Sequence, residues 1–130
     1  MKPRVFIAED NPDLLPLLRE HFKHAPFDAE FVNTGLLASL QYHAAIRDGK
    51  PFDLLLLDHA MPMGLGLGVV AEIREQGDWN TPVILMTACT PKEVEKEARR
   101  LKVCRIVYKP FSDLIGPVSE CLEKEKANHV

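Results

Sequence analysis

The chain has 130 residues, 46% of them hydrophobic, so a single domain can bury enough apolar surface to fold without structural metal or disulfides. Its formal net charge of -3, with acidic and basic residues interspersed, argues against nucleic acid as the main partner, because phosphate binding favours a basic face. The chain has three cysteines and no C-x-x-C pair, which fits a reducing compartment. Its N-terminus is unlike a leader peptide, and it has no apolar stretch long enough to cross a membrane. We therefore expect a cytoplasmic protein without a membrane partner.

The first half of the chain alternates apolar strands with amphipathic helices. Residues 5–8 are predicted to form a strand, after which Asn11 and Pro12 suit the cap and the first position of a helix. Pro16 predicts an irregular or kinked start for that helix. A second strand is predicted over 27–32. The helix that follows it is marked by the spacing of Leu36, Leu37, Leu40 and Ala44, and ends near 48–51.

Four consecutive leucines, residues 54–57, lie between Pro51 and Pro62. A run of this length is too short for a stable helix and suits a strand that is buried on both faces. Asp58 follows at once, so it is predicted to lie at the carboxyl end of this strand, where α/β proteins place their chemistry. We therefore interpret Asp58 as the working residue of the protein.

The glycine-rich run 64–68 leads into a third helix, whose core face is predicted to be Val69, Val70 and Ile73. Such glycines can cradle phosphate, but no lysine follows them in the G-K-[ST] arrangement of a P-loop. We interpret them as serving turn geometry and helix packing.

The last third of the chain repeats the alternation. A fourth strand is predicted over 82–87, and Thr90 with Pro91 has the pattern of a helix start. A fifth strand is predicted over 105–108. The last helix is expected to open near Ser112, with an irregular first turn because Gly116 and Pro117 follow.

Five strands in strict alternation with five helices predict an α/β fold of the flavodoxin-like, doubly wound kind. For its five-stranded parallel sheet we expect the order 2-1-3-4-5, with helices on both faces. In this fold the carboxyl ends of the first, third, fourth and fifth strands meet at one edge. That edge would carry Glu9, Asp10, Asp58, Thr87 and Lys109.

Three carboxylates at one edge would all be ionised at neutral pH and would repel one another. At about 4 Å and an effective dielectric near 20, each pair costs on the order of 4 kcal/mol before compensation. A positive charge must therefore lie among the carboxylates to offset this repulsion, either Lys109 or a divalent ion. A small site with oxygen ligands suits Mg²⁺. An ionised aspartate needs no general base to attack phosphorus. We therefore expect Asp58 to accept a phosphoryl group, with Thr87 donating a hydrogen bond to it.

Short motifs at these strand ends together resemble the receiver domain of two-component response regulators. They are Glu9-Asp10-Asn11-Pro12, Asp58 with Met61-Pro62 and Gly66, Thr87-Ala88, and Lys109-Pro110-Phe111. The resemblance covers essentially the whole chain, so it implies one receiver domain over 1–130, of the stand-alone type. It implies a signalling module and not an enzyme. The module would catalyse its own phosphorylation and its own slow dephosphorylation. Its donor would be a phosphohistidine on a sensor histidine kinase or a histidine phosphotransfer protein in a phosphorelay.

The resemblance also implies a role for each site residue. Asp58 would be the phosphoacceptor, and Mg²⁺ would be held by Asp10, Asp58, the Ala60 backbone carbonyl and, partly through water, Glu9. Phosphate contacts and switching would fall to Thr87, Ala88 and Lys109, with a cis bond between Lys109 and Pro110. Phosphorylation would alter binding to a downstream protein, and a homodimer could form through the fourth helix, fifth strand and fifth helix.

Three positions depart from the family pattern, and one of them is Leu65, which stands where an aspartate often precedes the glycine. Ile106 stands where receivers usually carry an aromatic switch residue, although Tyr108 should share its face of the strand. His59 replaces the usual apolar residue after the phosphoacceptor. Cys89, two residues beyond Thr87, occupies a position that tunes the lifetime of the phosphoryl group. We therefore expect signal transmission through Ile106 and Tyr108, and altered dephosphorylation kinetics.

Two other functions remain open from the sequence. One is a receiver that binds its partner constitutively, without phosphate, which Ile106 and His59 make credible. The other is an enzyme on the same fold, either an aspartyl-phosphate hydrolase or a flavin-binding protein. Against the hydrolase, Ala60 stands where a second aspartate is normally found. Against the flavin protein, Glu9 and Asp10 would repel phosphate at the loop after the first strand.

Overall fold

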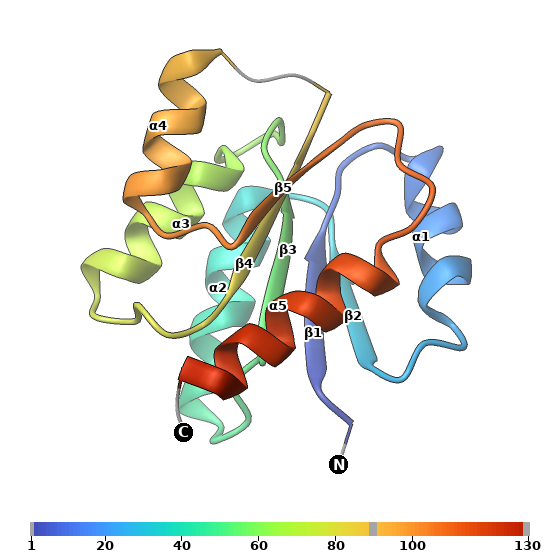
Figure 1. The fold of residues 1–130 in the computed structure, drawn as a ribbon, viewed down its shortest axis with the longest axis horizontal. Helices are drawn as coiled ribbons and strands as arrows, with labels where there is room; N and C mark the ends of the chain where they lie inside the picture. Colours follow the sequence, from blue (N-terminus) through green and yellow to red (C-terminus); the bar gives the residue numbers. More distant parts are fainter. Residues whose placement is uncertain (1, 89–90, 129–130) are drawn as a thin grey trace.

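The computed structural model of the chain describes residues 2–88 and 91–128. Five parallel strands form one sheet in the order β2-β1-β3-β4-β5, which confirms the predicted fold class (Figure 1). Within the described residues, no helix is long and apolar enough to cross a membrane. The elements in chain order are β1 (Arg4–Ala8), α1 (Leu14–Phe22), β2 (Asp28–Val32), α2 (Gly35–Arg47), β3 (Leu54–Asp58), α3 (Gly66–Glu75), β4 (Val83–Thr87), α4 (Lys92–Arg100), β5 (Arg105–Tyr108) and α5 (Ile115–Asn128).

The sheet has an apolar core on each face. Helices α1 and α5 cover one face, and α2, α3 and α4 cover the other (Figure 1). Leu55 and Leu57 of β3 pack on the α2 side, whereas Leu54 and Leu56 pack on the α1 side. Because successive side chains of a strand point to opposite faces, a central strand of this fold must be apolar throughout. The leucine run therefore forms the strand that its composition predicts.

The starts of two helices differ in detail from the sequence predictions. Helix α1 begins at Leu14, and the Asn11 side-chain oxygen accepts hydrogen bonds from the backbone N–H groups of Asp13 and Leu14, at 2.9 and 3.4 Å. Pro16 lies in the first turn, where an N–H group would have no acceptor within the helix, so the helix tolerates it. Helix α5 begins at Ile115 instead of near Ser112. The predicted cap at Thr90 and the Cys89 position lie outside the described residues.

Helix α2 turns the leucines that marked it in the sequence toward solvent. Leu36 is 49% exposed and Leu40 is 56% exposed. The buried residues of the helix are instead Gly35, Ala38, Tyr42 and Ala45. Small residues at the helix start are required there, because a Cβ on Gly35 would overlap the carbonyl of Gly64 in the loop after β3. Spacing alone thus predicted the helix but did not identify its buried face.

Gly66, at the start of α3, lies close to the backbone at the end of β3. A Cβ at this position would lie 2.5 Å from the backbone oxygen of Asp58, whereas a Cβ on Gly68 would meet nothing within 4 Å. We expect Gly66→Ala to lower the free energy of unfolding by about 2 kcal/mol, because backbone must move to relieve the overlap. Gly68→Ala is the matched control and should raise stability by up to about 1 kcal/mol, through helix propensity. Urea unfolding measures both, and equal effects would contradict the steric argument.

Candidate functional site

Polar side chains gather at the carboxyl end of the sheet. Asp58 ends β3, Thr87 ends β4, and Glu9 and Lys109 directly follow β1 and β5. With Asp10, they line one cavity of about 600 Å³, as the predicted convergence of strand ends requires. The other residues that line this cavity are Asn11, Pro12, His59, Ala60 and Ala88. The structure therefore brings together the residues that the sequence assigned to acceptor, metal and phosphate contacts.

Lys109 joins two of the buried carboxylates. Its Nζ lies 2.7 Å from Glu9 Oε1 and 3.2 Å from Asp58 Oδ2. Glu9 is fully buried, and its other oxygen accepts a hydrogen bond from the backbone N–H of Asn11 at 3.1 Å. The Lys109 backbone N–H donates to the carbonyl oxygen of Thr87 at 2.7 Å, which fixes the start of the lysine side chain beside β4. The cationic partner that the sequence required is therefore present, and it contacts Glu9 more closely than Asp58.

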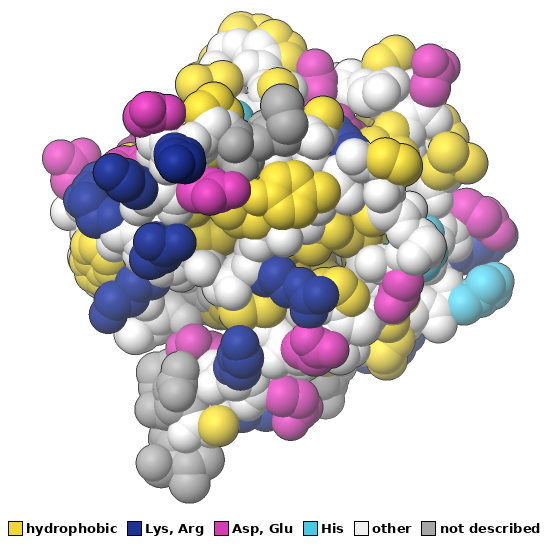
Figure 2. Space-filling view, turned by 45° about the horizontal axis from the view of Figure 1, so that its top comes forward, with side chains coloured by type: hydrophobic (Ala, Val, Ile, Leu, Met, Phe, Trp, Pro, Cys, Tyr) yellow, Lys and Arg dark blue, Asp and Glu magenta, His cyan; other side chains and the backbone are white. Residues whose placement is uncertain are grey.

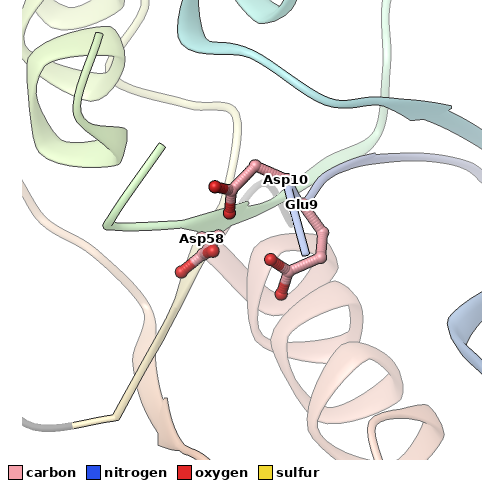
Figure 3. A group of neighbouring side chains, drawn as sticks. All are labelled: Glu9, Asp10 and Asp58. Carbon is pink, nitrogen blue, oxygen red and sulfur yellow. The ribbon is translucent and has the colours of Figure 1, made fainter. Parts of the chain in front are cut away.

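Glu9, Asp10 and Asp58 form a cluster of carboxylates. Figure 3 shows the three side chains converging, and each offers an oxygen that lies within 4.8 Å of the others. Asp10 is the most exposed of the three, so the cluster opens toward solvent on its side. A site with only oxygen donors, few protein ligands and an open side fits Mg²⁺, which keeps several waters and binds phosphate oxygens.

Burial makes Asp58 an unusual carboxyl group. Asp58 is 3% exposed, and desolvation, together with the hydrogen bond and negative charge of Glu9, raises its pKa to about 8. Burial also acts to raise the pKa of Glu9, but hydrogen bonds with Asp58, Lys109 and the Asn11 backbone bring it below its usual value. Burial acts to lower the pKa of Lys109, but the two carboxylates raise it overall. These opposite shifts favour a proton on Asp58 over one on Glu9 in this hydrogen-bonded pair of carboxyl groups.

This proton predicts how stability depends on pH in the metal-free protein. The pKa of Asp58 is higher in the folded than in the unfolded chain. Its contribution therefore favours folding at low pH and is lost as pH rises from about 4 toward 8. The pKa of the His59 imidazole is lower in the folded chain than its usual value of 6.5. Its contribution to the free energy of unfolding therefore increases as pH rises toward 6.5, opposite to that of Asp58. The comparison must therefore be made with Asp58→Asn, in which His59 is retained.

In EDTA, we compare the free energy of unfolding of Asp58→Asn with that of the wild type at each pH. As pH rises from 5 to 8, we expect this difference to shift in favour of the variant by on the order of 2 kcal/mol. The neutral amide has no proton to lose, so the variant lacks the Asp58 contribution altogether. Urea unfolding at several pH values measures the difference. A difference that does not change with pH would show that Asp58 titrates normally.

The β5 strand carries the two residues assigned to signal transmission, and both face α4. Ile106 is partly buried, and together with Val94 of α4 it packs against the core on this side of the sheet. Tyr108 is 45% exposed, and its hydroxyl donates to Glu95 Oε1 of α4 at 3.0 Å. Tyr108 also lies opposite Thr87 in the sheet register, and the Lys109–Pro110 bond is cis as the resemblance implied. The alternation argument for Ile106 and Tyr108 is confirmed.

His59 takes a place at the cavity that sequence reasoning did not assign to it. Its Nδ1 is a buried polar atom without a hydrogen-bond partner in the described structure, and burial lowers the pKa of the imidazole. In the sequence, its position next to Asp58 was the signal, but that position marked it only as a departure from the family pattern. Its presence leaves a neutral polar ring beside the carboxylates.

Comparison with known proteins gives a consistent result. Residues 5–114 match the family model described as "Response regulator receiver domain". The chain is 33% identical over 108 residues to the regulatory protein AtoC of Escherichia coli (strain K12), and 28% identical over 112 residues to the autoinducer 2 sensor kinase/phosphatase LuxQ of Vibrio vulnificus (strain YJ016). These alignments cover 83% and 85% of this chain but only 22% and 12% of those relatives.

The solved structures agree with the family match. The signal receiver domain of a putative Luxo repressor protein from Vibrio parahaemolyticus superposes with a TM-score of 0.83 and 28% identity, covering 99% of this chain and 96% of that one. A receiver domain protein from Methanospirillum hungatei JF-1, 18% identical, has the same fold with a TM-score of 0.84, covering 98% of this chain and 99% of that one.

Proposed function

The chain belongs to the response regulator receiver domain family, and on that premise we propose that it is a signalling module whose phosphoacceptor is Asp58. The observation that carries the proposal is the position of Asp58 in the lining of the cavity, with Lys109 Nζ 3.2 Å from its carboxylate. We further propose that residues 1–130 act as one receiver unit in the cytoplasm. Its donor would be a phosphohistidine on a sensor histidine kinase or a histidine phosphotransfer protein.

In the proposed reaction, a carboxylate oxygen of Asp58 attacks phosphorus, and the bond from phosphorus to the donor imidazole breaks. Asp58 must be ionised to attack, so the proton that it shares with Glu9 has to leave first. Lys109 then pairs with an oxygen of the incoming phosphoryl group, and the Thr87 hydroxyl and the Ala88 backbone lie at the same cavity to hydrogen-bond it. Asp10, Asp58, the Ala60 carbonyl and Glu9 would hold Mg²⁺. When bound, this ion would neutralise charge on the carboxylates and the phosphoryl oxygens.

The α4–β5–α5 face is the surface through which we propose that the phosphorylated protein binds a downstream protein or a second copy of itself. Figure 2 shows Lys and Arg side chains over the α4 side of this face, beside a band of hydrophobic side chains. The exposed basic residues of α4 are Lys92, Lys96, Arg99 and Arg100. Because Tyr108 spans β5 and α4 through Glu95 and lies opposite Thr87, movement of Thr87 toward a phosphoryl group would disturb this face first.

The test is phosphorylation by a small donor. Incubation of the protein with acetyl phosphate and Mg²⁺ should add one phosphoryl group, detected by intact mass, and hydroxylamine should remove it because the product is an acyl phosphate. EDTA should prevent the addition. A protein that gains no phosphoryl group, or gains one that hydroxylamine leaves in place, would overturn the assignment.

The same experiment separates the alternatives. A constitutive binding module would take up no phosphoryl group, and its partner binding would be unchanged by the donor. A hydrolase would turn over a phosphate ester, but Ala60 supplies no carboxylate side chain to activate water. The assembled Glu9–Lys109–Asp58 contacts favour the phosphoacceptor over both.

A further inference from the structure

A second chemical site lies at the opposite end of β5 from the carboxylates. Cys104, just before β5, and Cys121, in the middle of α5, form a disulfide with a Cα–Cα distance of 6.3 Å, inside the usual range for such a bond. The backbone N–H of Cys104 donates to the Val83 carbonyl at 2.7 Å, so this cysteine is held in place beside β4. Cys121 is 2% exposed and belongs to the core under α5. The two cysteines therefore join the edge strand of the sheet to the last helix.

The pair is reachable from solvent. Both cysteines line a cavity of about 380 Å³ whose other walls include Arg74, Trp79, Lys102 and Lys124. A cavity of this size falls within the range of small-molecule sites. Cys104 is the more exposed of the two residues, so a small reagent meets it before the buried Cys121.

The cavity is electropositive. Arg74, Lys102 and Lys124 line it with Glu125 as the single acidic residue. The Arg74 guanidinium donates to backbone carbonyls instead of a carboxylate, and it lies with Lys102 Nζ against the ring of Trp79. Positive charge near a cysteine favours its thiolate, which is the reactive form, and attracts anionic reagents.

We propose that Cys104 and Cys121 form an exchangeable dithiol–disulfide site that reacts with small anionic disulfides and thiols of the glutathione type. In the oxidising direction, the Cys104 thiolate attacks one sulfur of the small disulfide, and one small thiolate leaves. The Cys121 thiolate then attacks Cys104 Sγ and closes the intramolecular bond, releasing the second small thiolate. The two protein thiols lose two electrons, the small disulfide gains them, and the two protein protons pass to the small thiolates.

Closing this bond ties α5 to the start of β5 across 17 residues of chain. It constrains the unfolded chain and should raise the thermal midpoint by about 10 °C in a domain of this size. The proposal does not depend on phosphorylation of Asp58, because the two sites share no residue.

The experiment uses the Cys89→Ser protein, in which Cys104 and Cys121 are the only cysteines. After reduction, it is mixed with equal concentrations of glutathione disulfide, which is anionic, or cystamine, which is cationic. We expect both thiols to disappear together without a retained adduct, and glutathione disulfide to react several-fold faster at low salt. Lys102→Gln combined with Lys124→Gln should remove that preference. A stable adduct, unreactive thiols or equal rates with the two reagents would overturn the proposal.

Single cysteine variants in the same background identify the order of attack. Cys121→Ser should accumulate one mixed disulfide on Cys104, because no second thiol is present to displace it. In Cys104→Ser the remaining thiol is the buried Cys121, which should react with the small disulfide roughly ten-fold more slowly than Cys104 does in Cys121→Ser. Equal adduct formation by the two variants would contradict Cys104 as the attacking residue. Thermal unfolding of the oxidised and reduced forms checks the expected stabilisation, and equal midpoints would refute it.

Discussion

Asp58→Asn should abolish uptake of the phosphoryl group from acetyl phosphate. The amide has no ionised oxygen to attack phosphorus. Among the carboxylates of the cluster, only Asp58 both lies beside Lys109 and ends a strand that pairs with β4, the strand that carries Thr87. The replacement has nearly the same shape, so it should preserve the packing at the end of β3. We expect the mass of the variant to stay unchanged under conditions in which the wild type gains one phosphoryl group.

Asp48→Asn is the matched control for this substitution. Asp48 is an exposed aspartate at the end of α2 that does not line the cavity. Its carboxylate lies 3.5 Å from the Arg47 side chain. It should be phosphorylated as fully as the wild type. Labelling that persists in Asp58→Asn would place the acceptor elsewhere, and loss of labelling in Asp48→Asn would point to a general effect of removing a carboxylate.

Arg74→Met should lower the free energy of unfolding by about 3–5 kcal/mol, because it leaves several backbone oxygens without a partner. Arg74 is 2% exposed, and it donates to the carbonyl oxygens of Leu101, Asp78 and Thr81, each at 2.9 Å. It therefore ties the end of α4 to the loop between α3 and β4. Methionine fills similar space but donates no hydrogen bond. The change in the free energy of unfolding therefore reports the lost hydrogen bonds more than lost packing.

Arg99→Met tests whether the effect belongs to the buried position. Arg99 lies on the exposed face of α4, two residues before Leu101, whose carbonyl accepts a hydrogen bond from Arg74. Replacing it should change the free energy of unfolding by no more than about 0.5 kcal/mol. Urea unfolding of both variants gives the comparison. A small effect for Arg74→Met, or an equal one for Arg99→Met, would show that the buried hydrogen bonds contribute little net stability.

Much of the site was predictable from local sequence. A leucine run followed by Asp58 defines a buried parallel strand and its carboxyl end, and the parallel sheet then brings Glu9, Asp10, Thr87 and Lys109 to the same edge. The convergence follows from topology, because every parallel strand ends on the same side of the sheet. Short motifs were therefore sufficient to predict which side chains meet, although they lie up to 100 residues apart in the chain.

The tertiary structure decided what depends on close packing and on the local environment. Local spacing predicted helix α2, but only the packing shows its buried face, in which Gly35 lies against Gly64 and Ala38, Tyr42 and Ala45 are also buried. The Cys104–Cys121 pair and the carbonyls held by Arg74 come from segments that only the packing of α5, α4 and β5 brings together. The proton on Asp58 has the same origin. Sequence alone predicts an ionised aspartate, and only burial beside Glu9 raises its pKa to about 8, because desolvation depends on what surrounds a carboxyl group.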